Sequence, residues 1–158
     1  MSEIERIEGQ LKLAFEGGAW HGPSVLETLE GITARQAAAH PIPGVHSIWE
    51  LVAHIAAWES ACRRRLAGDR AELSTDEDWP SITDSSEAAW ALTKSELIEG
   101  HRKLRESIAF LTEARLNEPI LQGMRSVYVT LHGVIQHDLY HAGQIALLKK
   151  AAFGPETV

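Results

Sequence analysis

The stretch that decides the fold is IQHDLYHAGQI, residues 135–145. It places His137 and His141 four residues apart inside a long apolar segment. On an α-helix, residues four apart lie on the same face, one turn above the other. Two imidazoles presented in this way make half of a metal site. Because Val134 and Ile145 share this side of the helix, the stretch predicts an inward-facing helix that carries polar ligands.

Helical periodicity continues through nearly the whole chain, and the sequence therefore predicts an all-α fold. The length of 158 residues fits one domain, residues 1–158. Gly17-Gly18 is expected to interrupt the first helix. Four long helices, a split first helix and a short extra helix predict an antiparallel four-helix bundle, whose core can host metal ligands. The expected helices are residues 3–16, 24–29, 33–40, 48–66, 88–111 and 127–151.

Two local signals mark the start and the end of the helix expected at residues 48–66. Ser47 followed by Glu50 predicts a capping box at its start, and Gly68 predicts its end. Residues 69–83 then form an acidic connection that contains Trp79. This connection is long for a compact domain, and we therefore expect it to cover part of the structure.

Composition excludes several classes of function. The chain has 22 acidic and 15 basic residues, a net charge of -7, and one short basic cluster at residues 63–65. Nucleic acid is therefore not an expected partner, because binding it needs a basic surface. A single cysteine, Cys62, excludes an intrachain disulfide and a thiol-based zinc site. With no apolar leader or membrane-length apolar run, we expect a cytoplasmic protein that acts on a small molecule.

His54 is the best candidate for a third metal ligand. It lies in the middle of the helix expected at residues 48–66, between Leu51 and Trp58 on the packed side. A single inward histidine is usually a core residue satisfied by hydrogen bonds. Three inward histidines on two facing helices favour a shared cation, because each buried imidazole needs a polar partner. By contrast, we expect His40 and His101 to be exposed to solvent.

The residue after His137 argues against a metalloprotease. In the helical zinc-protease motif, a glutamate in that position acts as the general base. Here the position holds Asp138, which has a shorter side chain and points away from the face of His137 and His141. Asp138 either orients a neighbouring group or faces solvent. Three protein ligands would leave coordination positions open for water or a substrate.

Two segments resemble signatures of the DinB/YfiT-like superfamily. They are SIWELVAH at residues 47–54, followed by Trp58-Glu59, and HDLYHAGQI at residues 137–145. WHGPS at residues 20–24 and DWP at residues 78–80 are similar to one branch of it. The resemblance implies a four-helix bundle in which His54, His137 and His141 hold a divalent metal, zinc or nickel. It also implies a homodimer.

The resemblance implies a metal-dependent transferase that uses a low-molecular-weight thiol as the nucleophile. One alternative is a hydrolase that uses metal-bound water, for which Glu50 is the only base that the sequence offers. Another is a metal-binding stress protein without catalytic activity. The residues expected to orient the ligands or to line the pocket are Gln144, Tyr140, Glu50, Trp58, Trp20 and His21.

Overall fold

A computed structural model describes residues 1–153 and shows an all-α chain. The expected long helices are confirmed, with a short helix, α5, and a 3-10 turn, η1, in the connections where the sequence predicts none. The elements are α1 (Glu3–Glu16), α2 (Val25–Leu29), α3 (Ala34–Ala38), α4 (Ile48–Leu66), α5 (Thr75–Asp78), α6 (Glu87–Ala109), η1 (Glu113–Asn117) and α7 (Val127–Phe153).

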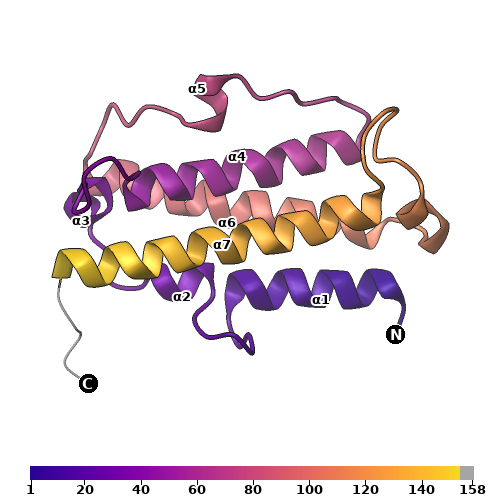
Figure 1. Ribbon diagram of the computed structural model, residues 1–158, viewed down its shortest axis with the longest axis horizontal. Coiled ribbons are helices and arrows are strands. Elements are labelled where there is room, and N and C mark those ends of the chain that lie inside the picture. Colours follow the sequence, from indigo (N-terminus) through magenta and orange to yellow (C-terminus); the bar gives the residue numbers. More distant parts are fainter. Residues whose placement is uncertain (154–158) are drawn as a thin grey trace.

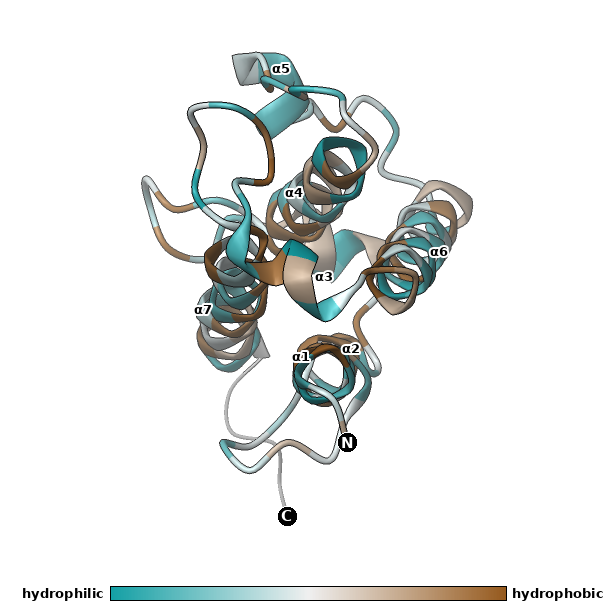
Figure 2. Cartoon of the chain, turned by 90° about the vertical axis from the view of Figure 1, so that its right-hand side faces the viewer, coloured by the Kyte–Doolittle hydropathy of each residue, from teal (hydrophilic) through white to brown (hydrophobic). Residues whose placement is uncertain are grey.

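The long helices form a four-helix bundle (Figures 1 and 2). Seen end-on in Figure 2, α4, α6 and α7 occupy three corners, and α1 with α2 occupies the fourth. The helices α1 and α2 follow one another along the bundle as a split first helix (Figure 1). Gly17 and Gly18 separate them, with φ of 136° and 77°. These backbone conformations favour glycine, so this pair interrupts the helix as the sequence predicts.

The bundle is not antiparallel throughout. The α4–α7 and α1–α6 pairs are antiparallel, but α4 and α6 run in the same direction (Figure 1). Trp49 donates a hydrogen bond to Thr93 near the start of both helices, and Glu59 contacts His101 further along both. The reason is the connection from α4 to α6, which returns along the length of the bundle and includes α5. Helical periodicity carries no information about this direction.

Side-chain caps define where the helices begin. The Ser47 hydroxyl accepts a hydrogen bond from the backbone N–H of Glu50, and the Glu50 carboxylate accepts one from the N–H of Ser47. This reciprocal pair satisfies two backbone donors that the helix itself leaves unpaired. After α4, Gly68 adopts φ of 97°, a left-handed conformation that favours the chain reversal there. The cap and the stop both lie where the sequence predicts them.

Two groups of buried apolar side chains fill the bundle, one toward each end. Trp90 is central to the first group: it packs against Trp49 and donates a hydrogen bond to the carbonyl of Ile32. Leu104 and Ile108 belong to the second group. Within residues 1–153, no helix is both long enough and apolar enough to cross a membrane.

Candidate metal centre and adjoining pocket

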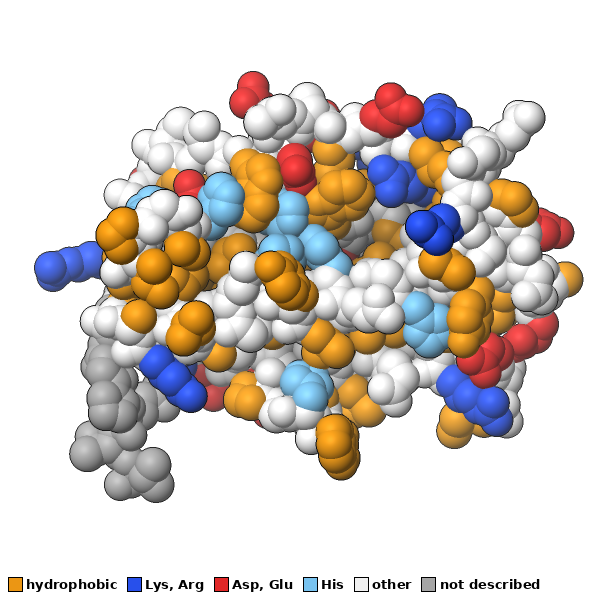
Figure 3. All heavy atoms as spheres, viewed as in Figure 1, with side chains coloured by type: hydrophobic (Ala, Val, Ile, Leu, Met, Phe, Trp, Pro, Cys, Tyr) orange, Lys and Arg blue, Asp and Glu red, His pale blue; other side chains and the backbone are white. Residues whose placement is uncertain are grey.

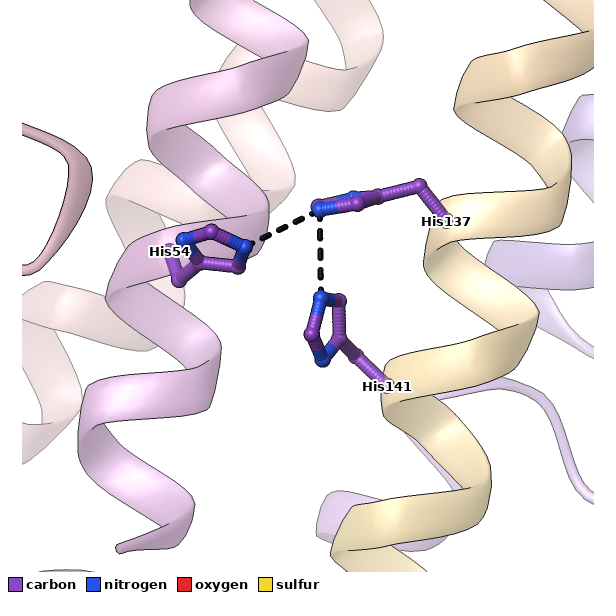
Figure 4. Close-up of side chains that lie close together, drawn as sticks. All are labelled: His54, His137 and His141. Atoms are coloured by element: carbon purple, nitrogen blue, oxygen red, sulfur yellow. Dashed lines mark hydrogen bonds between the residues drawn. The ribbon is translucent and has the colours of Figure 1, made fainter. Parts of the chain in front are cut away.

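Three histidines converge between α4 and α7 (Figure 4). His54 projects from α4, and His137 and His141 project from consecutive turns of α7. The Nε2 atom of His137 lies 3.0 Å from Nε2 of His54 and 3.1 Å from Nε2 of His141. His54 and His141 are buried, and His137 is partly exposed. The structure therefore brings together the three residues that the sequence selects.

In His54 and His141, the ring nitrogen that points away from the other histidines, Nδ1, faces a hydrogen-bond acceptor. Nδ1 of His54 lies 2.9 Å from both the backbone carbonyl oxygen and Oδ1 of Asp78. Nδ1 of His141 lies 2.6 Å from Oε1 of Gln144. Each Nδ1 therefore donates, and the acceptors place the proton on that nitrogen. The Nε2 lone pairs of both rings are then available at the point where the three rings meet.

These residues fit a divalent metal. A proton on Nε2 of His137 can be donated to only one of its two close neighbours, so the Nε2 lone pair of the other neighbour is left without a donor. Tetrahedral zinc, with Zn–N bonds of about 2.0–2.1 Å, sets ligand nitrogens about 3.3 Å apart, close to the separations observed. Burial lowers the pKa of His141, which keeps this imidazole neutral and competent as a ligand.

The connection between α4 and α6 covers the face of His54. Trp79 stacks on the His54 ring with centroids 3.9 Å apart, and His46 stacks on the other side of Trp79 at 3.6 Å. Asp78 accepts a further hydrogen bond from Nε1 of Trp58 at 2.6 Å. The expectation that residues 69–83 cover something is thus confirmed, although the sequence does not indicate that Asp78 orients His54.

An open pocket of about 600 Å³ adjoins the exposed edge of His137. Its walls are mostly apolar, and Figure 3 shows hydrophobic and basic side chains beside the histidines on this face. Two arginines line it, and none of the acidic residues that the structure describes does. The guanidinium of Arg65 lies over the Trp58 ring, and the exposed side chain of Arg125 makes no ion pair within residues 1–153. The pocket is therefore a basic site on an acidic protein.

Cys62 also borders this pocket, but it is not a suitable nucleophile. Its side chain is buried, and burial raises the pKa of the thiol to about 12. A thiol with such a pKa is almost entirely protonated at neutral pH, and the thiolate is the reactive form. The sequence predicts the same role, a small buried side chain.

Other residues predicted near the metal have different surroundings. Trp20 and His21 line a separate hollow against α1 and α7, and Trp20 is fully exposed, so the structure does not bring them to the three histidines. Tyr140 is exposed, with its ring edge-on to His141. The carboxylate of Glu50 is occupied: it caps α4 and contacts His40 and His46.

A second polar group, the inner cluster, is formed by Glu59, His101 and Asp138. It adjoins the three histidines, because Oδ1 of Asp138 lies 3.9 Å from Nδ1 of His137. Nδ1 of His101 lies 2.7 Å from Oε1 of Glu59, and all three side chains are buried. The prediction that His101 is exposed is therefore wrong, because it stacks on Phe15 inside the bundle. Of the two alternatives for Asp138, exposure to solvent is excluded, since its side chain is fully buried.

Burial controls the protonation of the inner cluster. It raises the pKa of Glu59 to about 8 and that of Asp138 well above its usual value. It lowers the pKa of His101 to about 4, and the nearby positive charge of Arg105 acts in the same direction. Each group thus favours its uncharged form, because none has enough compensating charge in the interior.

The metal-free protein is expected to lose stability between pH 6.5 and 8. The raised pKa of Glu59 means that the folded state holds the Glu59 proton more tightly than the unfolded state does. The stability that this proton contributes is therefore lost as pH rises toward 8. The lowered pKa of His101 acts oppositely, but only below about pH 6.5. Above pH 6.5, Glu59 lowers the free energy of unfolding by about 2 kcal/mol, and the raised pKa of Asp138 acts in the same direction. Urea titrations with a chelator test this, with Glu59→Gln as the control in which the slope becomes shallower.

Comparison with known proteins is consistent with the geometry. The sequence model of the DinB superfamily matches residues 20–145, a range that includes all three histidines. A crystal structure of a conserved protein from Enterococcus faecalis superposes with a TM-score of 0.74, covering 98% of this chain and 99% of that one. Its sequence identity is 20%, so this likeness shows the fold alone. No match was found among curated proteins.

Proposed function

Since this chain belongs to the DinB superfamily, we propose that it is a metal-dependent transferase that joins a low-molecular-weight thiol to a small electrophile. The observation that carries the proposal is the set of three converging Nε2 atoms beside an open pocket to which no residue in the range 1–153 contributes a carboxylate. A divalent metal held by His54, His137 and His141 would lower the pKa of a coordinating thiol and so supply a thiolate.

The missing carboxylate favours a thiol over water as the nucleophile. Hydrolysis by activated water commonly uses a nearby base to accept a proton. Glu50, the base that the sequence suggests, is occupied by its helix cap and by His40 and His46. Asp78 is bound to His54 and Trp58, and Asp138 is fully buried. A thiol whose pKa the metal lowers needs no such base in the pocket.

The pocket residues supply binding and orientation. Trp58 presents a flat apolar wall next to His137, on which the hydrocarbon part of a substrate can pack. Arg125 offers an unpaired guanidinium at the pocket, and Arg65 offers a second positive charge. Guanidinium groups bind carboxylates with two parallel hydrogen bonds. We therefore propose that the thiol or the electrophile carries a carboxylate.

The function is tested by incubating protein loaded with zinc or nickel with a panel of small thiols and a chromogenic electrophile. Thiol-dependent conjugation that is lost in His137→Ala supports the transferase. Ester cleavage without thiol would instead indicate a hydrolase. Binding of metal with neither activity would leave the alternative of a non-catalytic binding protein. His21→Ala is the matched control, because His21 lies in a different hollow from the three histidines.

Replacing Arg125 with alanine is expected to weaken binding of an anionic substrate. The charge-assisted hydrogen bonds of one exposed guanidinium are lost, and the KM of a carboxylate-bearing substrate should rise about tenfold with little change in kcat. A neutral analogue of the same shape should be unaffected. Arg102→Ala on α6 serves as the control, because Arg102 pairs with Glu99 and Glu106 on the surface. Equal effects on the charged and neutral substrates would contradict the role given to Arg125.

A further inference from the structure

The inner cluster contains buried polar atoms that are left unsatisfied within residues 1–153 while both carboxyl groups are ionised. They are Oε2 of Glu59, Nε2 of His101 and both carboxylate oxygens of Asp138. Such atoms are rare in folded proteins, because a buried acceptor that has lost its water costs free energy unless something replaces it. Four of them on three neighbouring side chains indicate a missing component rather than an isolated defect.

Charge identifies what that component is. Glu59 and Asp138 lie within hydrogen-bonding reach of each other, and within residues 1–153 no lysine or arginine forms an ion pair with either carboxyl group. His101 is not suited to supply the positive charge, because a protonated ring would leave its buried Nε2–H without an acceptor. Two carboxylates facing each other in an apolar interior require protons or a cation to compensate them.

The positions of the ligand atoms suit a cation. One ligand atom from each of Glu59, His101 and Asp138 lies within 4.8 Å of the other two. The side chains come from three different helices, α4, α6 and α7, so the packing of the bundle holds them in place. Two carboxylates and one imidazole also balance the charge of a dication.

We propose that Glu59, His101 and Asp138 form a second, fully buried site for a divalent cation, next to the three-histidine site. Oxygen-rich donor sets suit manganese, whereas sets of imidazoles suit nickel and zinc. The two sites are therefore expected to differ in preference, with manganese in the inner cluster and nickel at the three histidines. They share a segment of α7, because Asp138 directly follows His137.

The proposal is tested by refolding the full chain with manganese and nickel together, removing free ions, and measuring both metals by elemental analysis. We expect one ion of each per chain. Glu59→Gln, which keeps the shape of the side chain, should lose manganese and retain nickel. His137→Ala should lose nickel and retain manganese. This reciprocal pattern tests the two sites independently, so the proposal for the inner site and the proposal for the three-histidine site can each be contradicted without the other.

Two results would overturn the proposal. The first is wild-type protein that binds a single nickel ion and no manganese, which would mean that protons satisfy the inner carboxyl groups. Two nickel ions per chain would instead support the inner site and overturn only its preference for manganese. The second is manganese binding that Glu59→Gln does not change, which would place that ion elsewhere. Circular dichroism of each variant shows whether it is folded, and Asp138→Asn provides a second isosteric variant that must also lose manganese.

Discussion

His137→Ala is expected to abolish stoichiometric binding of nickel or zinc at the three histidines. Nε2 of His137 is the atom that makes both short contacts, to His54 and to His141, so its removal leaves two nitrogens that share no neighbour. The loss of affinity should exceed the roughly 10–100-fold effect that is typical of residues that only orient a ligand. Isothermal titration and elemental analysis of the purified variant measure it.

A graded series makes this result specific. Gln144→Ala removes the acceptor on Nδ1 of His141 but no ligand, and it should lower affinity by about tenfold. His21→Ala should leave the affinity unchanged, since His21 lies in another hollow. If His137→Ala binds metal as tightly as His21→Ala does, the three histidines are not the site.

Trp90→Ala is expected to cause the largest loss of stability in the α4–α6 interface. Trp90 is 1% exposed, and it packs on Trp49 and donates a hydrogen bond to the carbonyl of Ile32. Truncating a buried aromatic side chain costs about 3–5 kcal/mol, from lost burial and from the cavity that remains. The unpaired Ile32 carbonyl adds to this cost. Urea unfolding followed by circular dichroism measures the change.

The neighbouring residue Leu92 provides the control for this prediction. It lies on the same helix but is 59% exposed, so Leu92→Ala should change the free energy of unfolding by less than about 0.5 kcal/mol. Trp90→Phe should fall between the two variants, because the ring remains while the hydrogen bond is lost. A Trp90→Ala protein as stable as Leu92→Ala would show that this interface does not support the bundle.

The sequence predicts the helices well because their signals are local. Apolar spacing, the cap formed by Ser47 and Glu50, and the Gly17-Gly18 break all act within a few residues. The relative direction of α4 and α6 depends on the path of the long connection between them, which no local pattern encodes. This is why the sequence predicts a simple antiparallel order, whereas the structure shows a parallel α4–α6 pair.

The same distinction between local signals and the path of the chain applies to the residues of the candidate site. Helical spacing was enough to select His54, His137 and His141, because their faces follow from the helices that carry them. The sequence predicts an exposed His101 because charged residues flank it, although Leu97 and Leu104 mark its face of α6 as buried. Trp20 and His21 lie in an irregular segment, whose position relative to the bundle no periodicity predicts.

The placement of Asp78 on the connection between α4 and α6 has a thermodynamic consequence. Asp78 holds His54 in its orientation, so any ion that binds His54 favours the conformation in which this connection lies against α4. By linkage, the connection then favours the ion by the same factor. Metal affinity and the resistance of residues 69–83 to proteolysis are therefore two measurements of one equilibrium, and a single cut in that connection should raise the dissociation constant of the metal.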